Sequence, residues 1–118
     1  MSKSARTLFV WSLYLLGLGV ILVALPNLLL SLFGFPTTDE VWIRVVGVLL
    51  LLLAYYSYAS ARQDNRAYFH WSVPGRVVVP LFFIVFVLLN LAPVQLILFG
   101  LIDLAGAAWT WQALRSEG

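Results

Sequence analysis

Residues 45–54 of the chain read VVGVLLLLLA, an almost purely aliphatic run inside a longer apolar segment at residues 41–61. A helix of about 20 apolar residues is long enough to cross the hydrocarbon core of a bilayer. The segment therefore predicts a membrane-spanning helix, and the same criterion divides the rest of the chain.

The composition of the chain is also that of a membrane protein. Its 118 residues are 63% hydrophobic and 10% charged, whereas soluble domains carry about 25% charged residues. A chain this short has too much surface to bury so many apolar side chains in a water-soluble core. The absence of cysteine excludes disulfides and thiolate metal sites. The seven Lys and Arg residues lie mostly beside apolar runs, which favours a role in membrane orientation over nucleic-acid binding.

Three further apolar runs complete a four-span pattern, at residues 8–25, 74–90 and 93–114. We expect the first span to be uncleaved, because its apolar run exceeds the ~7–15 residues of a signal peptide. Pro26–Gly34 predicts a short separate helix in the membrane interface, with proline near its start and glycine at its end. Ser72 and Pro74 predict the start of the third span. The predicted fold class is all-α, a single-domain antiparallel four-helix membrane bundle.

Basic residues mark one face of the membrane. They lie in the N-terminal tail, between spans two and three, and in the C-terminal tail, as Lys3, Arg6, Arg62, Arg66 and Arg115. The loop between the first two spans carries Asp39 and Glu40 and no base. Since basic residues are retained on the cytoplasmic side, we expect both termini there, in a prokaryotic cytoplasmic membrane.

Asp103 is the most informative polar residue, because it falls near the middle of the fourth span. A charge at the bilayer centre costs roughly 2.5–3.5 kcal/mol on insertion scales, so acids there face the bundle interior and have a partner. Gly100, Gly106, Ala107 and Thr110 share its helix face, and small residues let neighbouring backbones approach. Asp103 is either a ligand-binding or proton-carrying carboxylate, or a structural group that is paired or kept neutral.

Arg44 is the expected partner of Asp103, if its side chain closes a depth difference of roughly 10 Å. It could instead extend outward to Asp39, Glu40 or lipid phosphate. Tyr55 follows on the same helix stripe, where it would line a polar cavity or belong to an aromatic belt.

Other polar residues are assigned to the membrane surfaces. Arg76 is expected to anchor on headgroup phosphate, since pairing with Asp103 would need a depth change of over ~10 Å. Asn90 and Gln95 flank the short connection between spans three and four, where they would cap helices or form the mouth of a pocket. The candidate polar-core or ligand-binding residues are Arg44, Asp103, Asn90, Tyr55 and Arg76.

Familiar catalytic motifs are absent from the sequence. His70 is the only histidine and cannot build a zinc or bis-histidine haem site alone. There is no Cys–His pair, G-x-S-x-G elbow, glycine-rich phosphate loop or H-E-x-x-H. These absences argue against a hydrolase or nucleotide-using enzyme, and no catalytic residue, metal or cofactor is assigned. They leave open a membrane enzyme that uses carboxylate and tyrosine.

Four short segments carry a resemblance: LFGFP at 32–36, WIRVVG at 42–47, GR at 75–76 and DLAGA at 103–107. Together they resemble a group of small four-helix bacterial membrane proteins, loosely similar to the DoxX-like proteins, over most of the chain. The resemblance implies a four-helix bundle with Arg44, Arg76 and Asp103 as recurring polar positions. Some members of that group are similar to small subunits of quinone-linked oxidoreductases, but this chain lacks the cysteines and multiple histidines of a redox site.

The favoured function is non-enzymatic: binding of a lipid-like, isoprenoid or quinone ligand, or service as a small accessory subunit of a membrane complex. The alternatives are a proton-coupled transporter or channel subunit that uses Asp103, and a small membrane enzyme on a lipophilic substrate. The expected partners are membrane lipids and either further copies of the chain or a larger membrane complex. The expected site is a cavity between spans two, three and four, open toward the outer half, with Asp103 as its floor, Arg44 on its wall and Gly100 beside it.

The predicted orientation can be tested with an alkaline phosphatase reporter fused after Gly118. The fusion should be inactive, because the reporter would remain in the cytoplasm with the C-terminus. A fusion in the loop at Asp39 and Glu40 should be active and serves as the control. Strong activity of the C-terminal fusion would refute the orientation.

Overall fold

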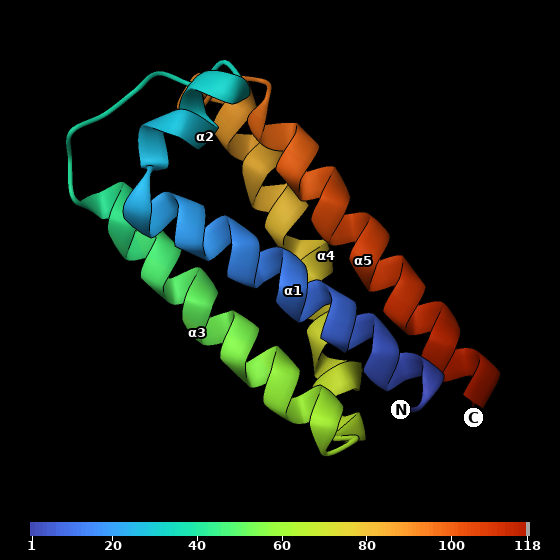
Figure 1. Cartoon of the computed structure of the whole chain (residues 1–118). Coiled ribbons are helices and arrows are strands. Elements are labelled where there is room, and N and C mark those ends of the chain that lie inside the picture. Colours follow the sequence, from blue (N-terminus) through green and yellow to red (C-terminus); the bar gives the residue numbers. More distant parts are fainter. Residues whose placement is uncertain (118) are drawn as a thin grey trace.

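A computed structural model describes residues 1–117, which form five helices (Figure 1). These are α1 (Lys3–Ala24), α2 (Pro26–Leu32), α3 (Trp42–Arg62), α4 (Arg66–Leu88) and α5 (Leu96–Glu117). No strand occurs within these 117 residues. All the helices except α2 are long and apolar enough to cross a membrane, which agrees with the predicted all-α fold.

The four long helices alternate in direction along the chain (Figure 1). The N-terminus, the end of α5 and the α3–α4 turn lie together at one end of the bundle, which we name the terminal end. Helix α2 and the two other connections lie at the opposite end, the α2 end. The most closely packed pairs are α1 with α3 and α4 with α5, whereas α3 and α4 make few contacts. The bundle is therefore built as two antiparallel pairs.

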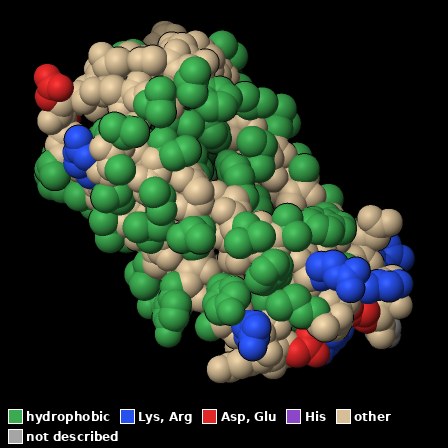
Figure 2. All heavy atoms as spheres, viewed as in Figure 1, with side chains coloured by type: hydrophobic (Ala, Val, Ile, Leu, Met, Phe, Trp, Pro, Cys, Tyr) green, Lys and Arg blue, Asp and Glu red, His purple; other side chains and the backbone are tan. Residues whose placement is uncertain are grey.

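Apolar side chains cover most of the face of the bundle seen in Figure 2, and most of the charged side chains on that face gather at the terminal end. The exposed large side chains include Trp42, Leu52, Phe82 and Leu101, one or more from each of α3, α4 and α5. Soluble monomers rarely expose so large a continuous apolar surface. The flanks are compatible with lipid as the surrounding solvent.

Helix α4 begins at Arg66, eight residues before the predicted start of the third span. Asn65 caps it, because its side chain accepts a hydrogen bond from the backbone N–H three residues later at 3.2 Å. Ser72 does not act as the predicted cap; its hydroxyl donates to the carbonyl three residues earlier at 2.8 Å, and Pro74 lies inside the helix. The connection between the second and third predicted spans is thus reduced to a turn at residues 63–65.

The other boundaries are closer to the predictions. The predicted short helix is confirmed as α2, and Gly34 follows it with a φ of 75°, a left-handed conformation that favours glycine. The tight connection after α4 is present, with Asn90 at a φ of 59°. Helix α1 begins at Lys3 rather than at residue 8, because the Ser2 hydroxyl caps it by accepting from the Ala5 N–H at 3.1 Å.

Helices α1 and α3 touch backbone to backbone at Gly19 and Gly47. A Cβ atom on Gly19 would lie 3.0 Å from the Gly47 carbonyl oxygen, and one on Gly47 would lie 2.9 Å from the Gly19 carbonyl oxygen. Small residues at a crossing are the usual means of close helix packing in membranes. Both positions need glycine for this contact.

Helix α5 packs closely through its own small residues. A Cβ on Gly100 would lie 3.0 Å from the Pro80 Cα, and one on Gly106 would lie 3.1 Å from the Trp11 ring and 3.2 Å from Nη1 of Arg76. The expectation that Gly100 borders a cavity is therefore wrong. These glycines bring α1 and α4 close to α5 and leave no hollow beside themselves.

Polar groups tie the terminal end together. The Glu117 carboxylate accepts hydrogen bonds from the Ser4 N–H at 2.7 Å and from the Ser4 hydroxyl at 2.6 Å. It also forms an ion pair with Arg66 at 2.9 Å. These residues belong to α1, α4 and α5, so this cluster fixes three helices at one end of the bundle.

Gly47→Ala should destabilise the protein, because the added methyl group would press on the backbone of α1; overpacked substitutions cost about 1–3 kcal/mol. Gly17→Ala is the matched control, since no atom lies within 4 Å of a Cβ added there. The control should be neutral or should stabilise by up to ~1 kcal/mol through helix propensity. Unfolding in detergent micelles, followed by circular dichroism, measures both. Equal effects would show that the glycine contact does not hold α1 on α3.

Candidate functional site

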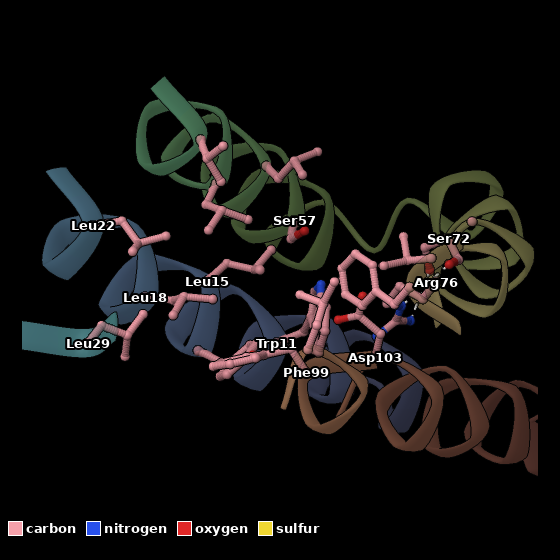
Figure 3. A pocket seen from close by; sticks show the side chains of 18 of the residues that line it. Trp11, Leu15, Leu18, Leu22, Leu29, Ser57, Ser72, Arg76, Phe99 and Asp103 are labelled. Carbon is pink, nitrogen blue, oxygen red and sulfur yellow. Dashed lines mark hydrogen bonds between the residues drawn. The ribbon is translucent and has the colours of Figure 1, made fainter. Parts of the chain in front are cut away.

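A cavity of about 590 Å³ lies between the α1–α3 pair and the α4–α5 pair (Figure 3). All five helices contribute to its wall. Small-molecule sites typically have volumes of about 300–1,000 Å³. The cavity is therefore large enough to be a binding site.

The wall of this cavity is apolar toward the α2 end. Leu22 of α1 and Leu29 of α2 lie at that end in Figure 3, and Leu18 follows toward the middle. Ile43 of α3 and Phe99 of α5 add to the same lining. Such a wall can hold hydrocarbon and offers it no hydrogen bond.

Arg76 of α4 lies at the opposite end of the cavity and is only 7% exposed. Its Nη2 donates to the Thr110 hydroxyl at 2.8 Å and to the Ser72 hydroxyl at 3.1 Å. The guanidinium carbon lies 4.9 Å from the centroid of the Trp11 ring, a cation–π arrangement. Nη1 is buried and has no hydrogen-bond partner among the described residues. Arg76 is thus a buried cation whose hydrogen-bond partners are all uncharged.

A line of hydroxyl groups runs from Arg76 toward the terminal end. Thr7 Oγ1 donates to the Ser4 carbonyl at 2.7 Å. Its 2.8 Å hydrogen bond with Thr110 must therefore be donated by Thr110, because each hydroxyl has one proton. Thr110 in turn accepts from Arg76. This buried chain joins α1, α4 and α5 and holds the guanidinium in place.

Asp103 of α5 is half-buried and lines the same cavity at its polar end (Figure 3). The hydrogen bonds of Arg76 go to Ser72 and Thr110 and not to Asp103. Within residues 1–117, the one ion pair is the contact of Arg66 with Glu117 at the terminal end. The structure therefore brings an acid and a base to one cavity without pairing them.

The expectation that Arg76 anchors on headgroup phosphate is wrong, because its side chain is buried in the bundle. A predicted helix start at residue 74 placed Arg76 near the membrane surface. Counted from the observed start at Arg66, it lies ten residues into α4, which is ~15 Å along the helix at ~1.5 Å per residue. Asp103 lies fourteen residues before the end of α5 at Glu117, which is ~21 Å from the same end, so the two depths differ by only ~6 Å.

Arg44 is not brought to Asp103. Its Nη1 donates to the Val23 carbonyl and, at 3.4 Å, to the Ala24 carbonyl. The last carbonyls of a helix lack partners within it, and basic side chains often satisfy them. The expected Arg44–Asp103 pair is wrong, and Arg44 is not part of the cavity wall.

The two other candidates also lie away from the cavity. Tyr55 is 64% exposed and packs on Tyr56 with ring centroids 5.8 Å apart. Asn90 is exposed in the α4–α5 turn. Near this turn, Gln95 donates to the Gly34 carbonyl at 3.2 Å and so ties the turn to the segment after α2.

Sequence reasoning missed the contribution of α1 to the cavity. Trp11 and Tyr14 line it, although the position of Trp11 near a span end predicts only an interfacial role. The sequence contains one indication of the contacts at the polar end of the cavity. Ser72 and Arg76 are four residues apart, and residues at that spacing share a helix face, but only a helix that starts before Ser72 gives them that relation.

Thr110→Val should destabilise the protein by about 1–3 kcal/mol, the usual cost of leaving a buried donor unpaired. The change removes the acceptor of Arg76 Nη2 and the donor to Thr7. Thr37→Val, in an exposed loop, is the control and should stay within about 0.5 kcal/mol. Unfolding in detergent measures both. A Thr110→Val protein as stable as the control would show that the hydroxyl chain contributes little.

No family model, curated protein or solved structure matches this chain. The resemblance to the DoxX-like proteins therefore stays a prediction. The function of the protein has to be argued from its own cavity and the residues around it.

Proposed function

We propose that this chain is an integral membrane protein that holds a lipid-like molecule in the cavity between its two helix pairs. The role is binding and needs no reaction. The observation that carries the proposal is the cavity itself, which is apolar along most of its wall and has Arg76 and Asp103 at one end.

The division of the cavity supports an amphiphilic ligand. Leucine and phenylalanine side chains line the part toward the α2 end, and Arg76 and Asp103 lie at the other part. A hydrocarbon tail would bury apolar surface along the first part, and a polar head would meet the second. A mostly apolar cavity with a few convergent polar groups is the common form of a small-molecule site.

The arrangement of the helices supports entry from the side. Helices α3 and α4 make few contacts with each other, and both contribute to the cavity wall. Gly75 of α4 lines the cavity and is itself exposed, which places it at an open edge. A lipid could enter between α3 and α4 without passing through water.

The proposal includes an orientation with the terminal end in the cytoplasm. The charged side chains at that end (Figure 2) include the bases of the N-terminal tail and of the α3–α4 turn. Basic residues of this kind are retained on the cytoplasmic side. Arg76 and Asp103 would then lie toward the middle of the bilayer, with the apolar wall extending toward the outer half.

Gly75→Leu tests the proposal by filling the cavity. No atom lies within 4 Å of a Cβ added at Gly75, so the leucine can be accommodated without moving the backbone. Native mass spectrometry of the gently extracted protein should show a lipid adduct on the unmodified chain. The variant should lose the adduct by about tenfold or more, which corresponds to at least ~1.4 kcal/mol of binding energy.

Gly17→Leu is the matched control for this experiment. Gly17 is an exposed helical glycine with no atom within 4 Å of an added Cβ, and it does not line the cavity. This control should keep the adduct. An unmodified chain without any lipid adduct, or a Gly75→Leu chain that keeps it, would contradict the proposal.

A further inference from the structure

We infer, on the basis of the proposed lipid-binding function, that the head of the bound molecule is electrically neutral and carries an O–H or N–H donor. Heads of this class occur in monoacylglycerols, long-chain alcohols and fatty amides. Heads with a net charge, such as a sulfate, a phosphate or a quaternary amine, would be disfavoured.

Arg76 brings a positive charge to the polar end of the cavity. Two of its nitrogen atoms are engaged, since Nε and Nη2 donate to the backbone and hydroxyl of Ser72 and to Thr110. Nη1 remains without an acceptor, on a side chain that is 93% buried by its 7% exposure. A Cβ atom on Gly106 would lie 3.2 Å from Nη1, so this atom is enclosed by the protein, and the head meets Arg76 through its charge rather than through Nη1.

The donor in the head is required by Asp103. An ionised carboxylate can only accept hydrogen bonds. Arg76, the base in the cavity lining, directs its bonds to Ser72 and Thr110, and no ion pair involving Asp103 occurs within residues 1–117. A hydroxyl or amide N–H of the head would satisfy the carboxylate, whereas an ester or ether oxygen would not.

Neutrality follows from the charges on the cavity wall. Arg76 and Asp103 are the two acidic or basic side chains that line the cavity. One positive and one negative group leave the site with no net charge. An anionic head that met Arg76 would be repelled by Asp103, and a cationic head that met Asp103 would be repelled by Arg76.

Four probes with the same oleyl chain separate these possibilities. Monoolein has a neutral head with donors and acceptors, methyl oleate has acceptors only, oleyl sulfate is a permanent anion, and oleyltrimethylammonium is a permanent cation. Binding to the delipidated full chain in detergent would be measured by titration calorimetry. Monoolein should bind about tenfold or more tightly than each of the others, the equivalent of one good hydrogen bond or more.

Asp103→Asn provides the charge test. The variant leaves Arg76 as the only charge on the wall, so oleyl sulfate should gain at least about tenfold in affinity and overtake monoolein. The fold should tolerate the change, because Asp103 forms no ion pair within the described residues. Asp39→Asn makes the same change of charge in the exposed loop after α2 and should leave the order of the four probes unaltered.

The outcomes separate this inference from the proposed function. Binding of all four probes with similar affinity, tightest binding of oleyl sulfate to the unmodified chain, or an unchanged order in Asp103→Asn would each overturn the neutral-head inference and leave lipid binding intact. Failure of every probe to bind would overturn both.

Discussion

At Gly19 and Gly47 the backbones of α1 and α3 lie against each other, with no room for a methyl group between them. This contact draws α3 toward α1 and away from α4, with which α3 makes few contacts. Helix α5 is held to α4 in the same manner, through Gly100 and Pro80. The bundle is consequently dense within each pair and open between the pairs. The cavity is the space that two tight glycine crossings leave in a bundle of four helices.

Arg76 is stable inside this bundle because its charge is dispersed over several weak acceptors. Hydroxyl groups of Ser72 and Thr110 and the face of Trp11 surround the guanidinium. None of these carries a compensating charge, so the guanidinium keeps much of its capacity to attract a polar group. In a direct ion pair, Arg76 and Asp103 would satisfy each other, and neither would be available to a third polar group. The proposed lipid-binding function depends on this absence of pairing, because it leaves both groups available to a bound molecule.

The sequence predicted the four long helices, the short α2 and the tight α4–α5 connection well, since apolar runs, prolines and glycines mark them directly. It predicted a midspan Asp103, which the structure places about a third of the way along α5, and it misjudged the depth of Arg76. The reason is local: Ser72 and Pro74 form a strong start signal, while Asn65 is the cap that the helix uses. Arg44 was misassigned for a different reason. Its acceptors are backbone carbonyls at the end of α1, and no side-chain pattern marks them.

The contact of Ser4 with Glu117 has a consequence for how the protein is made. The two residues are 113 positions apart in the chain, and the Ser4 N–H at the start of α1 is satisfied by the carboxylate at the end of α5. During synthesis the first helix leaves the ribosome long before its last-turn partner exists. Its N-terminal turn must therefore rely on water and on the Ser2 cap until translation of the final helix is complete. The contacts at the terminal end can therefore form only after α5 has been made.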